Sequence, residues 1–528
     1  MKTGNGNKRD MRYRLFLVNP KLKYPHYIAQ RELSTLLNKR NFSVPLALPL
    51  IAALTPDHYD IRIIDEEMDP VPTDTKPDIV GITTLVSTIS RAKEIASLYR
   101  SMGSVVVLGG SYATFMTEEV LKYADCVVVG EAEGLWQQLL ADFEKGELKR
   151  VYQADSVPEF RKSPVPRWDL VDAENFLVLG VQVSRGCPYR CEFCLVNRMF
   201  GNRIRYRDID DVINEIKSLP SRNYFFVDDN IAAKKSYAKE LMKRLKPLGI
   251  SWACQANLDV ADDEELLEDM AEAGCFSILI GLESINPESL KETNKMHNNI
   301  SRYDAAIRRI HAHGMYVSAS FIVGFDSDTP EVFDHIYDFS SRNNLSFIVI
   351  GPLTAAPGTD LYERMKKEDR LLDIDPEYVN GVFPSMRYRN MSLTEMFDRY
   401  YETTDRLLRP DVVRRKALAL FSGGTFMRKE GIDVGIVDKV STFLTLLKKY
   451  LLSPDARKRK LFLDLVFIGH SGKVPMHKVV VYLLTYLGFE EYFKSAKSYL
   501  PGIREMLQQV EQNAAQQPPG RAPLSFRK

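Results

Sequence analysis

Three cysteines stand within eight positions of one another, at Cys187, Cys191 and Cys194. Thiolates are soft ligands that suit zinc or iron and sulfur. A structural zinc site ordinarily closes with four ligands, and no second Cys or His pair lies nearby at the spacing of a zinc ribbon or finger. Three thiolates instead suit a [4Fe-4S] cluster whose fourth iron stays open to a chelating ligand. The spacing therefore predicts an iron–sulfur site, with structural zinc as the alternative.

The cysteines belong to the segment Gly186-Cys187-Pro-Tyr-Arg-Cys191-Glu-Phe-Cys194, which follows a predicted strand. In this context it resembles the C-x3-C-x2-C motif of the radical S-adenosylmethionine (SAM) superfamily, and Phe193 matches the aromatic residue beside the adenine. The resemblance implies that SAM chelates the open iron and is cleaved to methionine and a 5'-deoxyadenosyl radical. It also implies an external reductant such as flavodoxin or ferredoxin.

Six strand-like runs alternate with helices after the linker, at residues 181–184, 224–229, 251–257, 277–283, 317–324 and 347–352. This order predicts an incomplete (β/α)6 barrel, similar to a TIM barrel, with its chemistry at the strand C-termini. The resemblance places SAM contacts there. The candidates are Asp228, Asp229, Gln255, Asn257, Glu283, Ser320 and Gly324. The alternative for each is a solvated strand end or a helix cap.

Two further sets of potential ligands have a simpler interpretation. Cys254 and Cys275 lack ligand spacing, so we expect them to pack in the apolar core. His311 and His313 stand at a helix end before a glycine, where a basic surface cap is expected in place of a metal pair.

The chain before the linker also alternates near-continuous apolar runs with helical segments. This pattern predicts a doubly wound parallel sheet of the Rossmann-like kind, covered on both faces. Ligands in such sheets collect beyond the strand C-termini, where Asn19, Thr83, Gly109, Gly110 and Gly130 fall. The alternative is that the glycines only form tight turns.

A doubly wound domain just before a radical SAM barrel resembles the cobalamin-binding module of the B12-dependent radical SAM class. The loops at 83–87, 109–112 and 130–131 would then surround the corrin. The implied cobalamin contacts are Asn19, Thr83, Thr84, Ser87, Gly109, Gly110, Ser111, Gly130 and Glu131. The Asp-x-His-x-x-Gly segment of other B12 proteins is absent, which implies no protein histidine on cobalt. A purely structural flavodoxin-like domain is the alternative.

The segments at 321–330 and 353–362 resemble the subgroup with a C-terminal domain of unknown function, which includes hopanoid C-2 methylase-like proteins. The resemblance implies a C-methyltransferase that uses two SAM molecules, one to methylate cobalamin and one to form the radical. Its substrate would be small or lipid-like. A cobalamin-containing cyclase, oxidase or rearrangement enzyme is one alternative, and a cobalamin- or iron–sulfur-binding protein without turnover is another. No added RNA-binding module is evident, so nucleic acid is not expected as a partner.

The overall composition indicates which partners and which cellular location to expect. The 71 basic and 70 acidic residues nearly cancel, so no whole-protein field gathers a charged partner. Neither a signal-peptide core nor a membrane-length apolar run is present, which predicts a cytoplasmic protein. Apolar and basic stretches alternate near residues 443–484, either as a surface that touches an anionic membrane or as ordinary core helices.

The expected organisation has five parts. They are a cobalamin-binding domain at 1–147, a linker at 148–175, a radical SAM partial barrel at 176–372, a helical C-terminal domain at 373–507 and a disordered tail at 508–528.

Overall fold

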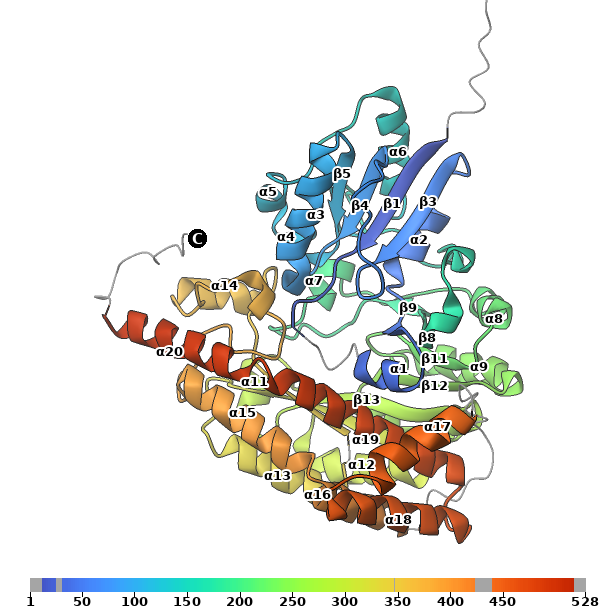
Figure 1. The fold of residues 1–528 in the computed structure, drawn as a ribbon, viewed down its shortest axis with the longest axis vertical. Coiled ribbons are helices and arrows are strands. Elements are labelled where there is room, and N and C mark those ends of the chain that lie inside the picture. Colours follow the sequence, from blue (N-terminus) through green and yellow to red (C-terminus); the bar gives the residue numbers. More distant parts are fainter. Residues whose placement is uncertain (1–11, 25–30, 346, 423–438, 517–528) are drawn as a thin grey trace, which may run out of the picture. The chain divides into compact units, whose positions relative to one another are not determined.

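The structure is a computed structural model that describes residues 12–24, 31–345, 347–422 and 439–516. The chain forms two compact units (Figure 1). The first comprises Met1–Lys23, Pro45–Asp172 and Met199–Gly201, and the second comprises Tyr24–Val44, Ala173–Arg198 and Asn202–Lys528.

The first unit is built on a six-stranded parallel sheet of order β3-β1-β4-β5-β6-β7. The strands are β1 (Tyr13–Asn19), β3 (Tyr59–Asp65), β4 (Ile79–Thr83), β5 (Val105–Gly109), β6 (Cys126–Val129) and β7 (Val151–Gln153). Alternate residues of β1 enter two different cores, Phe16 with helix α3 (Ile89–Ser101) and Leu15 with α2 (Ala47–Ala53) and α6 (Leu135–Lys145). Burial on both faces explains why the strands read as unbroken apolar runs. The predicted doubly wound sheet is confirmed.

The second unit contains a seven-stranded parallel sheet of order β15-β14-β13-β12-β11-β8-β2, curled into a half-barrel (Figure 1). Its strands are β2 (Asn41–Ser43), β8 (Phe176–Val181), β11 (Asn223–Phe226), β12 (Ser251–Ala256), β13 (Cys275–Glu283), β14 (Tyr316–Val323) and β15 (Phe347–Pro352). Helices α8 (Ile209–Ser218), α9 (Lys235–Leu245), α10 (Glu264–Glu272), α12 (Tyr303–Ala312) and α13 (Val332–Arg342) connect the strands. The predicted incomplete barrel is confirmed, with β2 added at one edge.

The boundaries differ from those expected at three places. Strand β2 pairs with β8, so Tyr24–Val44 belongs to the second unit although it precedes most of the first. Strand β7 extends the first sheet into the expected linker. Helix α20 (Leu500–Gln516) runs past residue 508, where a disordered tail was expected; residues 517–528 lie outside the described residues. Strands of three residues carry too little periodicity to be detected in the sequence.

The C-terminal helices share a core with the barrel. They are α15 (Leu393–Leu407), α16 (Pro410–Ser422), α17 (Lys439–Leu446), α18 (Ala456–His470), α19 (Met476–Lys497) and α20. The Tyr482 ring of α19 lies 5.2 Å from that of Phe347 and 6.0 Å from that of Tyr316, and Lys478 Nζ donates to the Gly314 carbonyl at 3.0 Å. The run that begins at Lys478 is therefore core, which corrects its candidacy as part of a membrane surface.

The expectation for the two other cysteines is confirmed, and the expectation for the two histidines is not. Cys254 and Cys275 are buried in the core as expected. His311 and His313 are also buried, so the expected surface cap is wrong; burial lowers the pKa of His311 to about 4. Nδ1 of His313 lies 2.9 Å from the Arg309 carbonyl, which explains how the sequence keeps a polar ring inside.

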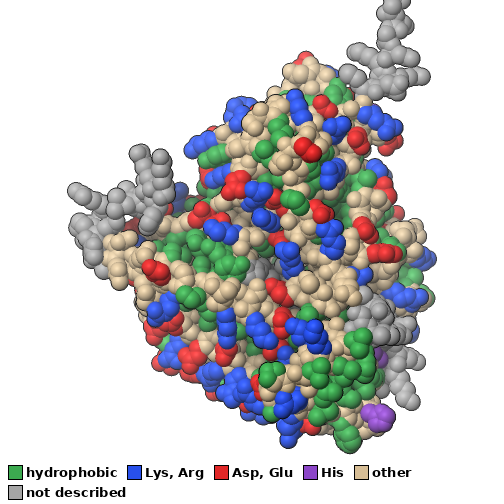
Figure 2. All heavy atoms as spheres, viewed as in Figure 1, with side chains coloured by type: hydrophobic (Ala, Val, Ile, Leu, Met, Phe, Trp, Pro, Cys, Tyr) green, Lys and Arg blue, Asp and Glu red, His purple; other side chains and the backbone are tan. Residues whose placement is uncertain are grey.

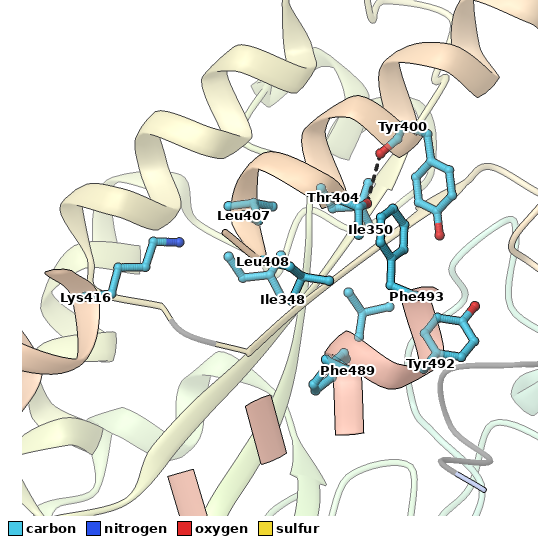
Figure 3. Close-up of a pocket in the computed structure, with 11 residues that line it drawn as sticks. Ile348, Ile350, Tyr400, Thr404, Leu407, Leu408, Lys416, Phe489, Tyr492 and Phe493 are labelled. Atoms are coloured by element: carbon cyan, nitrogen blue, oxygen red, sulfur yellow. Dashed lines mark hydrogen bonds between the residues drawn. The ribbon is translucent and has the colours of Figure 1, made fainter. Parts of the chain in front are cut away.

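Lys416 on α16 is a buried amine beside a cavity of about 30 Å³ between α15, α19 and β15 (Figure 3). Its Nζ donates to Ser340 Oγ and to the Leu345 carbonyl, each at 3.0 Å. Burial, with a smaller effect from Arg415, lowers the pKa of Lys416 from 10.5 to about 7. The cavity has room for one or two waters. The two hydrogen bonds of the lysine hold the chain before β15 in place.

This lysine makes stability depend on pH. Between pH 7 and 10.5 the unfolded chain binds a proton that the folded chain does not, so stability rises with pH. The free energy of unfolding of the wild type, relative to that of Lys416→Met, should rise by about 1.4 kcal/mol per pH unit between pH 7 and 10. Melting temperatures of both proteins across this range check the prediction, and parallel curves would contradict it.

Candidate cofactor site

The cysteine loop begins at the C-terminal side of β8, after the short strand β9 (Ser184–Arg185). The carboxylate of Asp228 is completely buried and accepts hydrogen bonds from Ser184 Oγ at 2.6 Å and from the Val183 N–H at 3.2 Å. Burial raises the pKa of Asp228 to about 7, although these hydrogen bonds oppose the shift. Asp228 therefore fixes the base of the loop, and its assignment as a SAM ligand stays a prediction.

The three thiols are partly buried on one short loop. Burial raises the pKa of all three, that of Cys194 to about 11. The charge of Cys187 affects Cys191, and the charges of Cys187 and Cys191 affect Cys194. In the described residues no three His, Cys, Asp or Glu side chains converge as around a single ion. A cubane gives each thiolate its own iron, so such convergence is not required of cluster ligands. The donor set fits a [4Fe-4S] cluster.

The loop is clamped from outside by an arginine. Glu192 lies between Cys191 and Phe193, and its carboxylate receives two hydrogen bonds from Arg364 of α14 (Asp360–Lys367), at 2.6 and 2.9 Å. Arg364 also donates to Asp326, at 3.0 Å. The backbone adds two bonds, from Leu361 N–H to the Glu192 carbonyl and from Glu192 N–H to the Thr293 carbonyl.

Arg364→Met should loosen the cysteine loop. A bidentate charge-assisted pair with 30% of the Arg364 side chain exposed should contribute about 1–2 kcal/mol. Trypsin cleavage of the iron-free chain at the exposed Arg190 should therefore accelerate about tenfold. Arg198→Met is the control, because it removes a half-exposed arginine whose contacts are weaker, 3.3 Å to the Gly358 carbonyl and 3.7 Å to the Asp360 carboxylate. Equal cleavage rates in the two variants would refute the clamp.

The strand ends bring together several predicted SAM contacts. Gln255 pairs in register with Leu279, and two residues further Gly281 pairs with Ser320, so Gln255 and Ser320 lie on the same face of the sheet. Asn257 follows two residues after Gln255, just beyond β12. Asp229 is partly buried, and burial raises its pKa to about 6.

The polar groups at this edge are not all satisfied. Among the described residues, the Asn257 amide nitrogen, the Tyr206 hydroxyl and one Asp259 carboxylate oxygen are buried without a hydrogen-bond partner. Buried polar atoms are normally paired, so unpaired ones suggest a place for a polar ligand. Tyr206 and Asp259 escaped the sequence analysis because neither belongs to a motif.

Gly324 and Glu283 have structural roles of their own. Gly324 has φ +98°, and a Cβ there would lie 2.6 Å from the Tyr388 ring. Glu283 is buried and pairs with Lys295, Nζ to Oε1 at 2.5 Å. Lys295 partly opposes the rise that burial causes in the pKa of the Cys187 and Cys191 thiols. No sequence motif pointed to this lysine. That Gly324 and Glu283 also contact SAM stays a prediction.

In the first unit the strand order reverses between β1 and β4, because β3 and β4 lie on opposite sides of β1. Asn19 ends β1 and donates to Asp65 at 2.9 Å, while Thr83 ends β4. Ligands of doubly wound sheets bind at such a switch point. The predicted contacts Ser87, Ser111, Gly130 and Glu131 lie just after β4, β5 or β6 at the same edge.

Thr84 and Gly110 build the turn beside this switch point. Thr84 Oγ1 donates to the Gly109 carbonyl at 2.7 Å and accepts from the Ala113 N–H at 3.0 Å. Gly110 has φ +94°, and a Cβ there would lie 2.6 Å from the Thr84 carbonyl oxygen. The turn therefore needs a glycine at this position.

Two other features of the first unit matter for the binding of a corrin ring. Leu85, which the sequence analysis missed, follows Thr84 and is 50% exposed, so it offers an apolar contact. His58 is the histidine of the first unit's described residues, and it precedes β3 at the opposite edge of the sheet. The residues at the switch point thus fit a cobalamin, and that no protein histidine binds its cobalt stays a prediction.

Comparisons with known proteins agree with both units. Residues 181–340 match the radical SAM superfamily, and residues 37–140 match the B12 binding domain. The bacteriochlorophyllide d C-12(1)-methyltransferase of Chlorobaculum tepidum is 31% identical over 65% of this chain and 78% of its own length. The hopanoid C-2 methylase of Rhodopseudomonas palustris is 28% identical over 65% of this chain and 68% of its own length. The solved structure of OxsB, a cobalamin-dependent SAM radical enzyme, has a TM-score of 0.57 at 15% identity, over 96% of this chain and 84% of its own.

The half-barrel with its cysteine loop and the doubly wound unit define a radical SAM enzyme that uses a [4Fe-4S] cluster, SAM and cobalamin. The chain belongs to the B12-dependent radical SAM family, and its enzymatic class is that of the C-methyltransferases.

Proposed function

We propose that this enzyme methylates an unactivated carbon of a lipid-like substrate. The observation that carries the proposal is the coexistence of a three-thiol loop at the C-terminal edge of the half-barrel and a ligand edge at the switch point of the first unit. The relatives that are named for hopanoids and bacteriochlorophyllides support an extended apolar substrate.

The residues divide the work as follows. We assign Cys187, Cys191 and Cys194 as the cluster ligands and Phe193 as the contact to adenine. Gln255 and Ser320 share the face that would orient SAM, and Asn257 follows just beyond the end of β12. The loops after β1, β4, β5 and β6 would hold cobalamin. When bound, cluster and SAM supply a carbon radical, and cobalamin supplies the methyl group. An external reductant such as flavodoxin or ferredoxin provides the electron.

The test is an anaerobic reaction with SAM that carries a deuterated methyl group, a chemical reductant and candidate hopanoid or tetrapyrrole substrates. A product that gains the labelled methyl, together with 5'-deoxyadenosine and S-adenosylhomocysteine, is expected. 5'-Deoxyadenosine with an unlabelled product would replace the proposal by a cyclase or oxidase. If neither 5'-deoxyadenosine nor a labelled product forms, the chain is a binding protein without turnover.

We also propose that the enzyme works in the cytoplasm against an anionic membrane. In the described residues no helix is long and apolar enough to cross a bilayer. Large apolar side chains instead gather on α17, the π-helical turn Leu447–Leu451 and α18 (Figure 2). This apolar surface consists of Phe443, Leu444, Leu451, Leu452, Leu463 and Phe467, which are 37–75% exposed.

Lysines accompany the apolar surface. On α18 the exposed face reads Lys460, Leu463, Phe467 and His470, at helical spacing, and Lys448 is exposed on the preceding turn. Apolar side chains next to lysines suit the headgroup region of an anionic bilayer.

Substitution of both Leu452 and Phe467 by glutamate should weaken binding to vesicles with anionic phospholipid at least tenfold, because each side chain contributes about 1.5–3 kcal/mol when buried. Co-sedimentation at low salt measures it. Val165→Glu, at an exposed apolar residue of the first unit, is the control. Absence of wild-type binding would reject the membrane proposal and leave methyl transfer untouched.

A further inference from the structure

Lys295 is a buried cation beside the cysteine loop. Its side chain is 10% exposed and that of its partner Glu283 is 9% exposed, with Nζ 2.5 Å from Oε1. The same ammonium lies 5.9 Å from the ring centroid of Phe193, the residue that directly precedes Cys194. Each partner of this buried ion pair compensates the charge of the other.

The backbone around the pair is specialised to hold it. Glu283 ends β13 with φ +62°, a conformation that side chains rarely adopt, and the register between β13 and β14 shifts between Gly281 and Glu283. A Cβ on Gly281 would lie 2.3 Å from Glu283 Oε1 and 3.1 Å from Lys295 Nζ. Asn298 fastens the connecting segment, because its amide donates to the Gly281 and Leu282 carbonyls at 2.8 and 3.0 Å.

The lysine lies beside the cysteine loop, because its Nζ is 5.9 Å from the ring centroid of Phe193, the neighbour of Cys194 in the chain. The Cys191 thiol is affected more by the lysine than by the Glu283 carboxylate, whereas at Cys187 the Asp229 carboxylate has a larger effect than the lysine. A positive charge at this place stabilises whichever state of a bound cluster carries more negative charge.

We propose that Lys295 sets the reduction potential of the cluster by holding a fixed positive charge beside Phe193 and the cysteine loop, with Glu283 as its positioning residue. One-electron reduction adds one negative charge to the cluster, and the cation favours that state. Hydrogen bonds, net charge and exposure are the known levers on cluster potential. The inference rests on the proposed ligation by the three cysteines.

The test is a potentiometric titration of the anaerobically reconstituted full chain, followed by electron paramagnetic resonance (EPR), without SAM and with dithionite as reductant. Lys295→Met and Lys295→Gln should shift the midpoint to more negative potential, while Lys295→Arg stays near the wild type. Lys291→Met, at a lysine that is 69% exposed on the preceding helix, is the matched control and should not shift.

Unchanged midpoints in the neutral variants with full cluster content would overturn the proposal. If Lys295→Met fails to hold iron, Lys295→Gln decides, because glutamine can still bond Glu283. Loss of the cluster in both, with Lys295→Arg intact, would make Lys295 a structural residue and would also overturn it. A wild type without any cluster would instead refute the proposed function.

Discussion

Replacement of Cys187, Cys191 and Cys194 together by alanine is expected to abolish the iron–sulfur cluster and leave the fold intact. The three thiols are partly exposed on a loop, so their loss removes little buried apolar surface. Iron content after anaerobic reconstitution should fall from about four per chain to background. Formation of 5'-deoxyadenosine from SAM should fall to the uncatalysed level.

The matched control is Cys126→Ala, at a buried cysteine of β6 in the first unit. It should lose some stability through its small cavity but keep its iron. Unchanged iron in the triple variant would mean that other ligands hold the metal, and the assignment of the cysteines would be wrong.

Gly110→Ala is expected to weaken cobalamin retention by about tenfold or more. The left-handed φ of +94° costs an alanine about 1–2 kcal/mol, and its Cβ would overlap the Thr84 carbonyl oxygen. The turn after β5 must then shift, and the turn after β4 with it. Cobalamin absorbance after desalting measures the loss, and iron content should not change because the cysteines lie in the other unit.

Gly146→Ala separates backbone strain from the site. Gly146 also has a left-handed φ, +73°, but nothing lies within 4 Å of a Cβ built there, and it caps the far end of α6. It should lose comparable backbone stability yet retain cobalamin. Equal loss of cobalamin in both variants would show that the turn after β5 is not part of the binding edge.

Both parallel sheets could be predicted from the sequence because strands buried on two faces are apolar throughout, as Val105–Gly109 and Cys126–Val129 are. The cysteine loop could be predicted because its spacing is local. Short strands such as β2 could not be predicted, because pairing with β8 across more than a hundred residues leaves no local pattern.

Supporting contacts of the site were harder to predict for the same reason. The Glu192–Arg364 clamp joins residues 172 positions apart, and Lys295 meets Glu283 through a strand end with an unusual backbone conformation. Lys478 looked like part of a basic surface, yet its Nζ is buried against the Gly314 carbonyl. Charge pattern alone does not distinguish a solvated lysine from a buried one.

The most direct measurement is the EPR spectrum of the reduced, reconstituted chain with and without SAM. Three cysteine ligands leave one iron open, so SAM should bind that iron and change the spectrum of the cluster. A strong cluster signal that SAM does not alter would show that the fourth iron is closed and would contradict the account.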